Sequence, residues 1–149
     1  MAMYMCPGCY KVYDSFRLRV FHTDDGTPHY LCPSITCAQL GTNLVELDDP
    51  IAKYIGRLNR MGYRTSACCS GHNYSYYLNI YILFRQEYKF DYLPEDWEYD
   101  KDKKRCIRYN IGGTNVPNID IVIGKAMHSL DVWINRMKDD MEKITRNKA

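Results

Sequence analysis

The spacing of apolar residues first predicts a helix from Pro50 to Met61. Apolar positions recur there every three or four residues, which places them along one face of a helix. Asp48 or Asp49 suits the N-terminal cap, and Pro50 suits the first turn. Gly62 follows the last apolar position, where a helix often ends on a left-handed residue.

A second helix is predicted from about Asp120 to Ile144. Its apolar positions keep a near-heptad spacing. Such a stripe usually packs on the sheet of its own domain, and a dimer seam is the alternative. The stripe consists of Ile123, Met127, Leu130, Ile134, Met137, Met141 and Ile144.

Alternating apolar and polar positions predict strands in both halves of the chain. Near the N-terminus, a strand from Phe16 to His22, the turn Asp24-Asp25-Gly26 and a return strand around His29 to Leu31 form a hairpin. Further strands are expected at Tyr63–Cys68, Tyr76–Arg85, Tyr88–Tyr92 and Arg105–Ile111, with Leu93–Trp97 as the opening of a loop. One shared core is predicted for Leu58, Tyr63, Leu78, Ile80, Ile82, Leu130 and Trp133.

These elements predict an α+β protein: an N-terminal zinc ribbon over residues 1–47, then an antiparallel sheet packed against two helices over residues 48–149. Hydrophobic residues make up 46% of the 149 residues, which is enough for a core. The longest uncharged stretch, Thr65 to Phe84, contains Asn, Ser, His and several Tyr, and is typical of a turn and strand rather than a membrane span. No signal peptide opens the chain, so a cytoplasmic location is expected.

The first cysteines carry the most specific chemical pattern of the sequence. Cys6 and Cys9 flank Pro-Gly, and Cys32 and Cys37 form a second pair after 22 intervening residues. Thiolates bind zinc tightly, and four of them close a tetrahedral site with no open position. We therefore predict one structural Zn²⁺ on these four residues. His22 or His29 could replace a sulfur, but four cysteines make this unnecessary.

The segment Leu58 to His72 is a second candidate site. A tight turn at a strand end presents Ser70, Gly71 and His72, and the N–H groups of such a turn can form a nest for an anion. Cys68 and Cys69 are either small buried residues or, less simply, a catalytic thiol or a second zinc site with His72. Taken singly, each residue has a structural explanation; together they predict a ligand site.

Basic and aromatic residues extend this prediction. Lys101, Lys103, Lys104, Arg105 and Arg108 form a cluster, although a net charge of +2 does not by itself indicate nucleic acid. Arg108 either faces an anionic ligand or forms an internal ion pair. Tyrosine occurs 14 times, and its residues either fill strand positions or form a stacking surface.

The motif LNRMGYRTSACCSGH resembles a motif of small uncharacterised proteins of Gram-positive bacteria (Firmicutes) and their phages. In these a helix ending Leu-Asn-x-x-Gly-Tyr precedes Thr and a Cys-Ser-Gly-His turn. Several have a leading zinc ribbon, and Leu93-Pro94, Ile107-Arg108 and Trp133 fit further positions of the pattern. This resemblance implies a phage or mobile-element protein.

The same turn is distantly similar to the Thr-x-Ser-Ser-Cys-Ser-Gly-Arg signature of the tRNA wybutosine-synthesis methyltransferases. Thr65, Cys69, Ser70 and Gly71 match, whereas His72 stands where that family has Arg. In that family the turn helps form the site for S-adenosylmethionine and tRNA. The similarity implies a ligand site at Thr65, Cys69, Ser70, Gly71 and His72.

We expect a non-catalytic binding protein that inhibits a host defence system. It would bind an anionic nucleotide or nucleic acid through the turn and Arg108, or bind a host defence protein, as a monomer or homodimer and away from membranes. The alternative is a nucleotide- or RNA-modifying enzyme similar to the wybutosine methyltransferases. The sequence contains no paired carboxylates, nucleotide fingerprint or open metal site, and this favours the binding protein.

Overall fold

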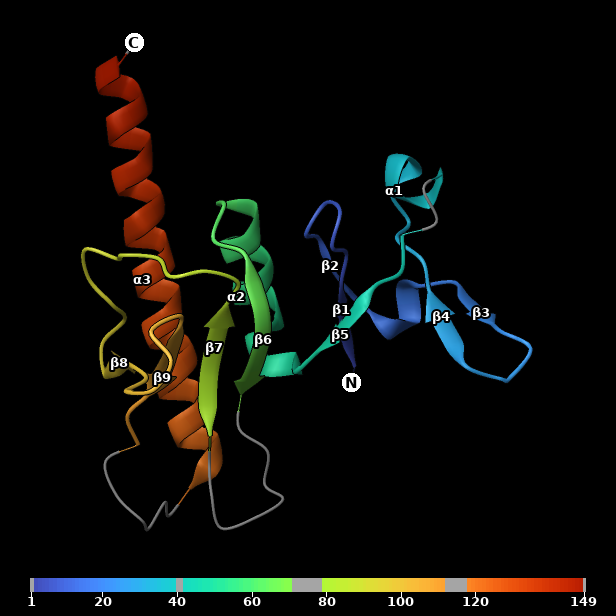
Figure 1. The fold of residues 1–149 in the computed structure, drawn as a ribbon, viewed down its shortest axis with the longest axis horizontal. Helices are drawn as coiled ribbons and strands as arrows, with labels where there is room; N and C mark the ends of the chain where they lie inside the picture. The colour runs from blue at the N-terminus through green and yellow to red at the C-terminus, as the bar shows by residue number, and fades with distance from the viewer. Residues whose placement is uncertain (1, 40–41, 71–78, 112–117, 149) are drawn as a thin grey trace.

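The chain folds into an N-terminal part built from short strands beside a larger part with a sheet and two helices (Figure 1). The computed structural model describes residues 2–39, 42–70, 79–111 and 118–148. Antiparallel sheets and helices make the fold a mixed α+β one, as predicted. The N-terminal part contains β1 (Met3–Met5), β2 (Val12–Asp14), β3 (Val20–His22), β4 (Pro28–Tyr30), α1 (Ile35–Gln39) and β5 (Val45–Leu47). The larger part contains α2 (Asp49–Arg60), β6 (Thr65–Ser70), β7 (Ile80–Phe84), β8 (Trp97–Tyr99), β9 (Cys106–Tyr109) and α3 (Ile119–Lys148).

The N-terminal part has two small antiparallel sheets, in the orders β2-β1-β5 and β3-β4. The predicted hairpin is present: Gly26 has a positive φ of 84°, and Asp25 accepts a 3.0 Å hydrogen bond from the Thr27 N–H. The predicted strand from Phe16 to His22 is shorter than expected. Asp14 accepts a hydrogen bond from the Phe16 N–H and caps a 3₁₀ turn at Ser15–Arg17, which replaces the start of that strand.

Helix α2 confirms the helix predicted after Asp48. Its apolar stripe is fully buried at Ile51, Ile55 and Leu58. Gly62 ends the helix with a φ of 101°, and the N–H of the next residue returns to the Leu58 carbonyl at 2.9 Å. This is the left-handed ending that glycine permits.

The larger sheet has the order β6-β7-β9-β8, and every pair in it is antiparallel. Figure 1 shows α2 and α3 on one side of it, and no described helix covers the other side, which we call the outer face. The predicted strand at Tyr88–Tyr92 is wrong. The Tyr88 and Phe90 rings instead pack against Phe84 and cover one end of the core, which leaves this segment without a strand partner.

The sequence did not predict strand β8, because Trp97 follows a Pro-containing segment that is typical of a loop. It forms because β9 offers it a free edge, where Trp97 pairs with Tyr109. The two rings meet edge to face. Pairing with a distant strand thus outweighs the local loop signal.

The main core lies between the sheet and the two helices. Leu58, Ile80, Ile82, Leu130 and Trp133 are at most 2% exposed, as predicted, and Tyr63 packs at the border of this core. Leu78 lies outside the described residues. Two of the predicted stripe positions of α3 are exposed, Met141 at 41% and Ile144 at 56%, because the end of α3 extends beyond the rest of the molecule (Figure 1). No described helix has the length and apolar character needed to cross a membrane.

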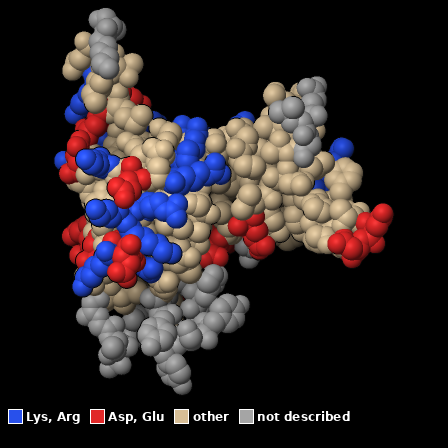
Figure 2. All heavy atoms as spheres, in the orientation of Figure 1, with Lys and Arg blue, Asp and Glu red and all other residues tan. Residues whose placement is uncertain are grey.

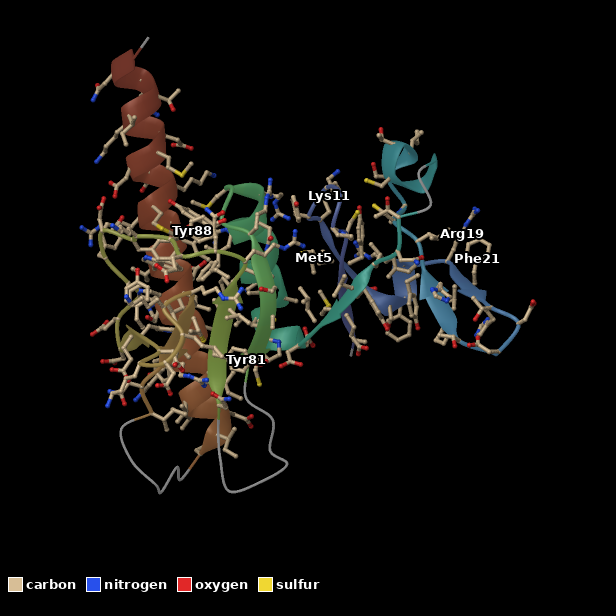
Figure 3. The ribbon with its side chains drawn as sticks, in the orientation of Figure 1. Met5, Lys11, Arg19, Phe21, Tyr81 and Tyr88 are labelled. Carbon is tan, nitrogen blue, oxygen red and sulfur yellow. The ribbon has the colours of Figure 1, made fainter. Side chains whose placement is uncertain are left out.

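The N-terminal part packs directly on α2. Met5 belongs to the main core and lies between the three-stranded sheet and α2 (Figure 3). A Cβ on Gly56 of α2 would lie 2.6 Å from Val12 Cγ2 and 3.0 Å from the Tyr10 carbonyl oxygen. The absence of a side chain at Gly56 therefore sets how closely β2 approaches the helix.

Candidate functional site

Four cysteines come together in the N-terminal part, as the sequence predicted. The Sγ atoms of Cys6, Cys9, Cys32 and Cys37 all lie within 4.8 Å of one another. Cys6, Cys32 and Cys37 are buried and Cys9 is partly exposed. Such a cluster could hold a metal ion.

Local backbone structure positions this cluster. Cys6 and Cys9 stand in the turn between β1 and β2, where the Tyr10 N–H donates to the Cys6 carbonyl at 2.7 Å. Gly8 gives its N–H to the Cys6 sulfur at 3.3 Å, and a Cβ on Gly8 would lie 3.3 Å from the Cys37 sulfur. Glycine thus allows this turn to approach the second cysteine pair, which follows β4 and enters α1.

The spacing and chemistry of the four sulfurs suit a cation. All seven cysteines are free of disulfides, and the Cys9 and Cys32 sulfurs are 3.8 Å apart. Burial raises the pKa of the Cys6, Cys9 and Cys37 thiols. Burial also opposes ionisation of Cys32, but hydrogen bonds from Ser34, Cys6 and Tyr13 outweigh it and lower the pKa of that thiol. Together, the four thiols could lose their protons only if a cation balanced their charge.

The second candidate site is only partly described. Gly71 and His72 lie outside the described residues. Thr65 is buried and hydrogen bonds to Asn59, at the opposite end of β6 from Ser70. Ser70 is 2% exposed, and its N–H donates to the Asp48 carboxylate at 3.0 Å.

Cys69 and Arg108 share the outer face of the sheet. Both pair with Tyr81, Cys69 from β6 and Arg108 from β9, so the three side chains stand in one row. Ser70 pairs with buried Ile80, which puts its side chain on the helix-covered face. The structure therefore brings Cys69 and Arg108 together and separates them from Thr65 and Ser70.

Cys68 has the environment of a structural thiol. It packs against the main core, and burial, followed by the nearby Asp48 carboxylate, raises its pKa to about 12. The thiol is protonated near neutral pH, and a protonated thiol is a poor nucleophile.

Arg108 forms the internal ion pair that was its alternative explanation. Its Nε donates to the Asp100 carboxylate, and its Nη1 donates to Asn79 Oδ1 at 2.5 Å. The guanidinium also lies 5.3 Å from the centre of the Tyr81 ring. The Arg108 hydrogen bond is the main reason that the pKa of Asp100 falls to about 2.

Four arginines gather at the junction of the two parts, and only Arg105 of these belonged to the basic cluster noted from the sequence. We call Arg60, Arg64, Arg85 and Arg105 the arginine band. Figure 2 shows Lys and Arg side chains gathered across this face, over the start of β6 and the end of β7. Among the described residues, none of the four has an acidic group within ion-pair distance.

Backbone carbonyls hold the band in place. Arg60 Nη1 donates to the Tyr10 carbonyl at 2.6 Å, and the Arg64 guanidinium stacks 4.1 Å from the centre of the Tyr10 ring. Arg85 Nε donates to the Thr65 carbonyl at 3.2 Å, and Arg105 Nη1 donates to the Arg85 carbonyl at 3.5 Å. Neutral carbonyls orient these side chains without cancelling their charge.

The band borders a groove of about 200 Å³ between the N-terminal part and the sheet. Tyr10 lines it from one side and Ser66 and Arg85 from the other. Tyr10 directly follows Cys9 and has a positive φ of 61°, so the cysteine cluster and the band meet at this residue. Arg60 and Arg64 flank the Gly62 turn and Arg85 ends a strand; no sequence periodicity links these positions.

Comparison with protein-family models, with curated proteins and with solved structures finds no match for this chain. The cysteine cluster and the arginine band are therefore the features that bear on function.

Proposed function

We propose that this protein is a non-catalytic, zinc-stabilised binding protein for single-stranded nucleic acid. The observation that carries the proposal is the arginine band, whose four guanidinium groups have no ion-pair partner within the described chain. Phosphate is the ligand that arginine forks match best, and a phosphate backbone presents several phosphates in a row.

The cysteine cluster supports zinc as its ion and a ribbon as its fold. A tetrahedral site with zinc–sulfur bonds of about 2.3 Å has sulfur–sulfur edges of about 3.8 Å. The Cys9–Cys32 separation of 3.8 Å equals that edge. Four thiolates leave no position for water, so the ion would stabilise the fold and not act on a substrate.

The outer sheet face supports a single strand as the ligand. No described helix covers this face, and Tyr81 of β7 stands on it, four positions before Arg85 of the band (Figure 3). An aromatic ring on the path of a bound strand can stack on an unpaired base while arginines further along contact the backbone. The bases of a duplex are already stacked on one another, which favours a single strand.

Binding without catalysis is the simpler function. Cys68, which packs against the main core, is protonated at neutral pH and supplies no nucleophile. In the phage setting that the sequence resemblance implies, such a protein would inhibit host defence by withholding a nucleic acid from a host enzyme.

Titration of fluorescent single-stranded DNA and RNA tests the proposal. Replacing both Arg85 and Arg105 by Ala should weaken binding about tenfold at about 0.1 M salt, and should reduce the slope of log K against log salt by about 1.4. The double change Lys125→Ala and Lys143→Ala is the matched control. It removes the same charge from exposed positions of α3, away from the band.

Two results would contradict the proposal. Wild-type protein that binds neither oligonucleotide at low salt has no such site. A band variant that binds as tightly as the α3 control, with both variants folded, would show that the charge of the band does not matter.

A further inference from the structure

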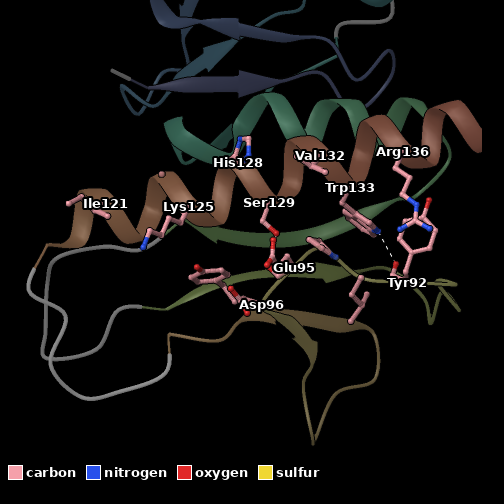
Figure 4. Close-up of a pocket in the computed structure, with 14 residues that line it drawn as sticks. Tyr92, Glu95, Asp96, Ile121, Lys125, His128, Ser129, Val132, Trp133 and Arg136 are labelled. Carbon is pink, nitrogen blue, oxygen red and sulfur yellow. Dashed lines mark hydrogen bonds between the residues drawn. The ribbon is translucent and has the colours of Figure 1, made fainter.

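A second concave site lies on α3, apart from the arginine band. The segment Tyr92–Asp96 faces the first half of α3 across a pocket of about 740 Å³ (Figure 4). That volume falls within the range of small-molecule sites, which are mainly apolar and contain a few fixed polar groups.

Gly124 opens the α3 side of this pocket. A glycine inside a helix costs about 1 kcal/mol relative to alanine. A Cβ at Gly124 would meet no atom within 4 Å, so packing does not require the glycine. Its missing side chain leaves space in the lining of the pocket.

The aromatic walls are fixed before any ligand arrives. Trp133 is 2% exposed, and its indole N–H donates to the Tyr92 carbonyl at 2.9 Å. The Tyr92 hydroxyl donates to the Asp140 carboxylate at 2.5 Å, and the Arg136 guanidinium stacks 3.7 Å from its ring centre. Both rings are therefore held rigidly, and the buried Trp133 closes this end of the pocket.

The loop residues Glu95 and Asp96 are also held in place, by hydrogen bonds to their backbone carbonyls. The Ser129 hydroxyl donates to the Glu95 carbonyl at 2.6 Å, and the Asn110 N–H donates to the Asp96 carbonyl at 2.7 Å. Asp96 has a positive φ of 63°, a conformation that Asp and Asn adopt more readily than most residues.

Charged groups of both signs border the pocket. Glu95 and Asp96 stand on the loop, and Lys125 stands on α3 (Figure 4). In the part of the chain that the structure describes, none of the three has an ion-pair partner within 4.0 Å. The two signs thus face one space without neutralising each other.

We propose that this pocket binds a zwitterionic small molecule with a flat aromatic body. Its ammonium group would meet Glu95 and Asp96, and its carboxylate would meet Lys125. The ring would lie in the space that Gly124 leaves open, against Ile121, which lines the same end of the pocket and is 55% exposed. The site is independent of nucleic-acid binding, because it uses none of the residues of the band.

Three indole probes separate the contributions of charge and ring: tryptophan, tryptamine without the carboxylate, and indole-3-propionate without the ammonium. Calorimetry or NMR titration should show saturable binding of all three, with tryptophan tightest. The double change Glu95→Gln and Asp96→Asn should weaken tryptophan and tryptamine about fivefold and spare indole-3-propionate. Lys125→Gln should weaken tryptophan and indole-3-propionate by a similar factor and spare tryptamine.

Gly124→Leu places a side chain in the space assigned to the ring and should abolish binding of all three probes, while its melting temperature shows that the exposed helix position tolerates the change. The proposal is overturned if no probe binds at concentrations up to about 10 mM, about ten times a weak dissociation constant of 1 mM. It is also overturned if Gly124→Leu binds like wild type, or if the charge variants affect all three probes equally.

Discussion

Asn59 is a buried amide at the end of α2 that connects the helix to β6. It is 1% exposed. Its Nδ2 donates to the Ile55 carbonyl at 2.8 Å and to Thr65 Oγ1 at 3.0 Å, and its Oδ1 accepts the Thr65 N–H at 3.1 Å. In this network Thr65 has a structural role, because its polar groups are already satisfied by Asn59.

Asn59→Ala should lower the free energy of unfolding by about 2–4 kcal/mol, since it leaves the buried Thr65 N–H without a partner. Urea denaturation measures this loss. Asn147→Ala, which truncates an exposed amide near the end of α3, should change stability by less than about 0.5 kcal/mol. Equal effects of the two changes would show that burial of the Asn59 network contributes nothing.

The ion pair of Arg108 and Asp100 makes a prediction about pH. The Arg108 hydrogen bond lowers the pKa of Asp100 to about 2, below the value of about 3.9 in an unfolded chain. A lowered carboxyl pKa stabilises the fold above about pH 4, and this contribution disappears as the pH falls through about 2.

Arg108→Ala should raise the pKa of Asp100 toward its ordinary value, which NMR titration of the carboxyl carbon would detect. Arg105→Ala is the control, because Arg105 has no ion pair with Asp100 among the described contacts. An Asp100 pKa near 4 in the wild-type protein would contradict the observed pair.

The stability of a helix depends on how closely its neighbours pack against it, and two helical glycines show opposite cases. A Cβ on Gly56 would clash with Val12, whereas a Cβ on Gly124 would meet nothing within 4 Å. Alanine has the higher helix propensity at both positions, so the surroundings decide the sign of the effect.

Gly124→Ala should raise stability by about 1 kcal/mol, and Gly56→Ala should lower it despite the same gain in propensity. Thermal unfolding of the two variants compares them directly. If Gly56→Ala also raised the melting temperature, the close contact between β2 and α2 would not be required for stability.

The contribution of helix α3 to the core changes along its length. Leu130 is fully buried and Ile144 is 56% exposed. Leu130→Ala should therefore cost about 2–5 kcal/mol, and Ile144→Ala should cost almost nothing. A large loss of stability at Ile144, increasing with protein concentration, would instead identify the end of α3 as a dimer seam.

At the scale of the whole molecule, the cysteine cluster, Tyr10 and the arginine band are connected in space. Tyr10 follows Cys9 in the chain, Arg60 donates to its carbonyl, and Arg64 stacks on its ring. Met5 precedes Cys6 and is buried in the main core. An ion at the cysteines would therefore order both the N-terminal part and the surface that we propose for nucleic acid.

Metal analysis should find one zinc per chain, and Cys32→Ser or a strong chelator should release it. Because Met5 and Val12 pack on α2, loss of zinc should lower the melting temperature of the whole protein and weaken oligonucleotide binding. Cys106→Ser is the control, since Cys106 lies in β9 outside the cluster. Reduced protein that contains no zinc and alkylates freely at Cys6 would contradict this proposal.

The sequence by itself determined the features whose signals are local. The spacing of four cysteines predicted their cluster, and helical periodicity with Gly62 at the end predicted α2. The apolar spacing of the last segment predicted α3, although not that Met141 and Ile144 would be exposed. Chain order fixes such patterns, because the interacting residues are a few positions apart.

Tertiary structure alone decided the features that join distant segments. It paired Trp97 with Tyr109, removed the strand predicted at Tyr88–Tyr92, and gave Arg108 the partner Asp100. It also assembled the arginine band from two turns and a strand end, and the α3 pocket from a helix and a loop. No sequence period links these positions, because packing and strand pairing between distant segments bring them together.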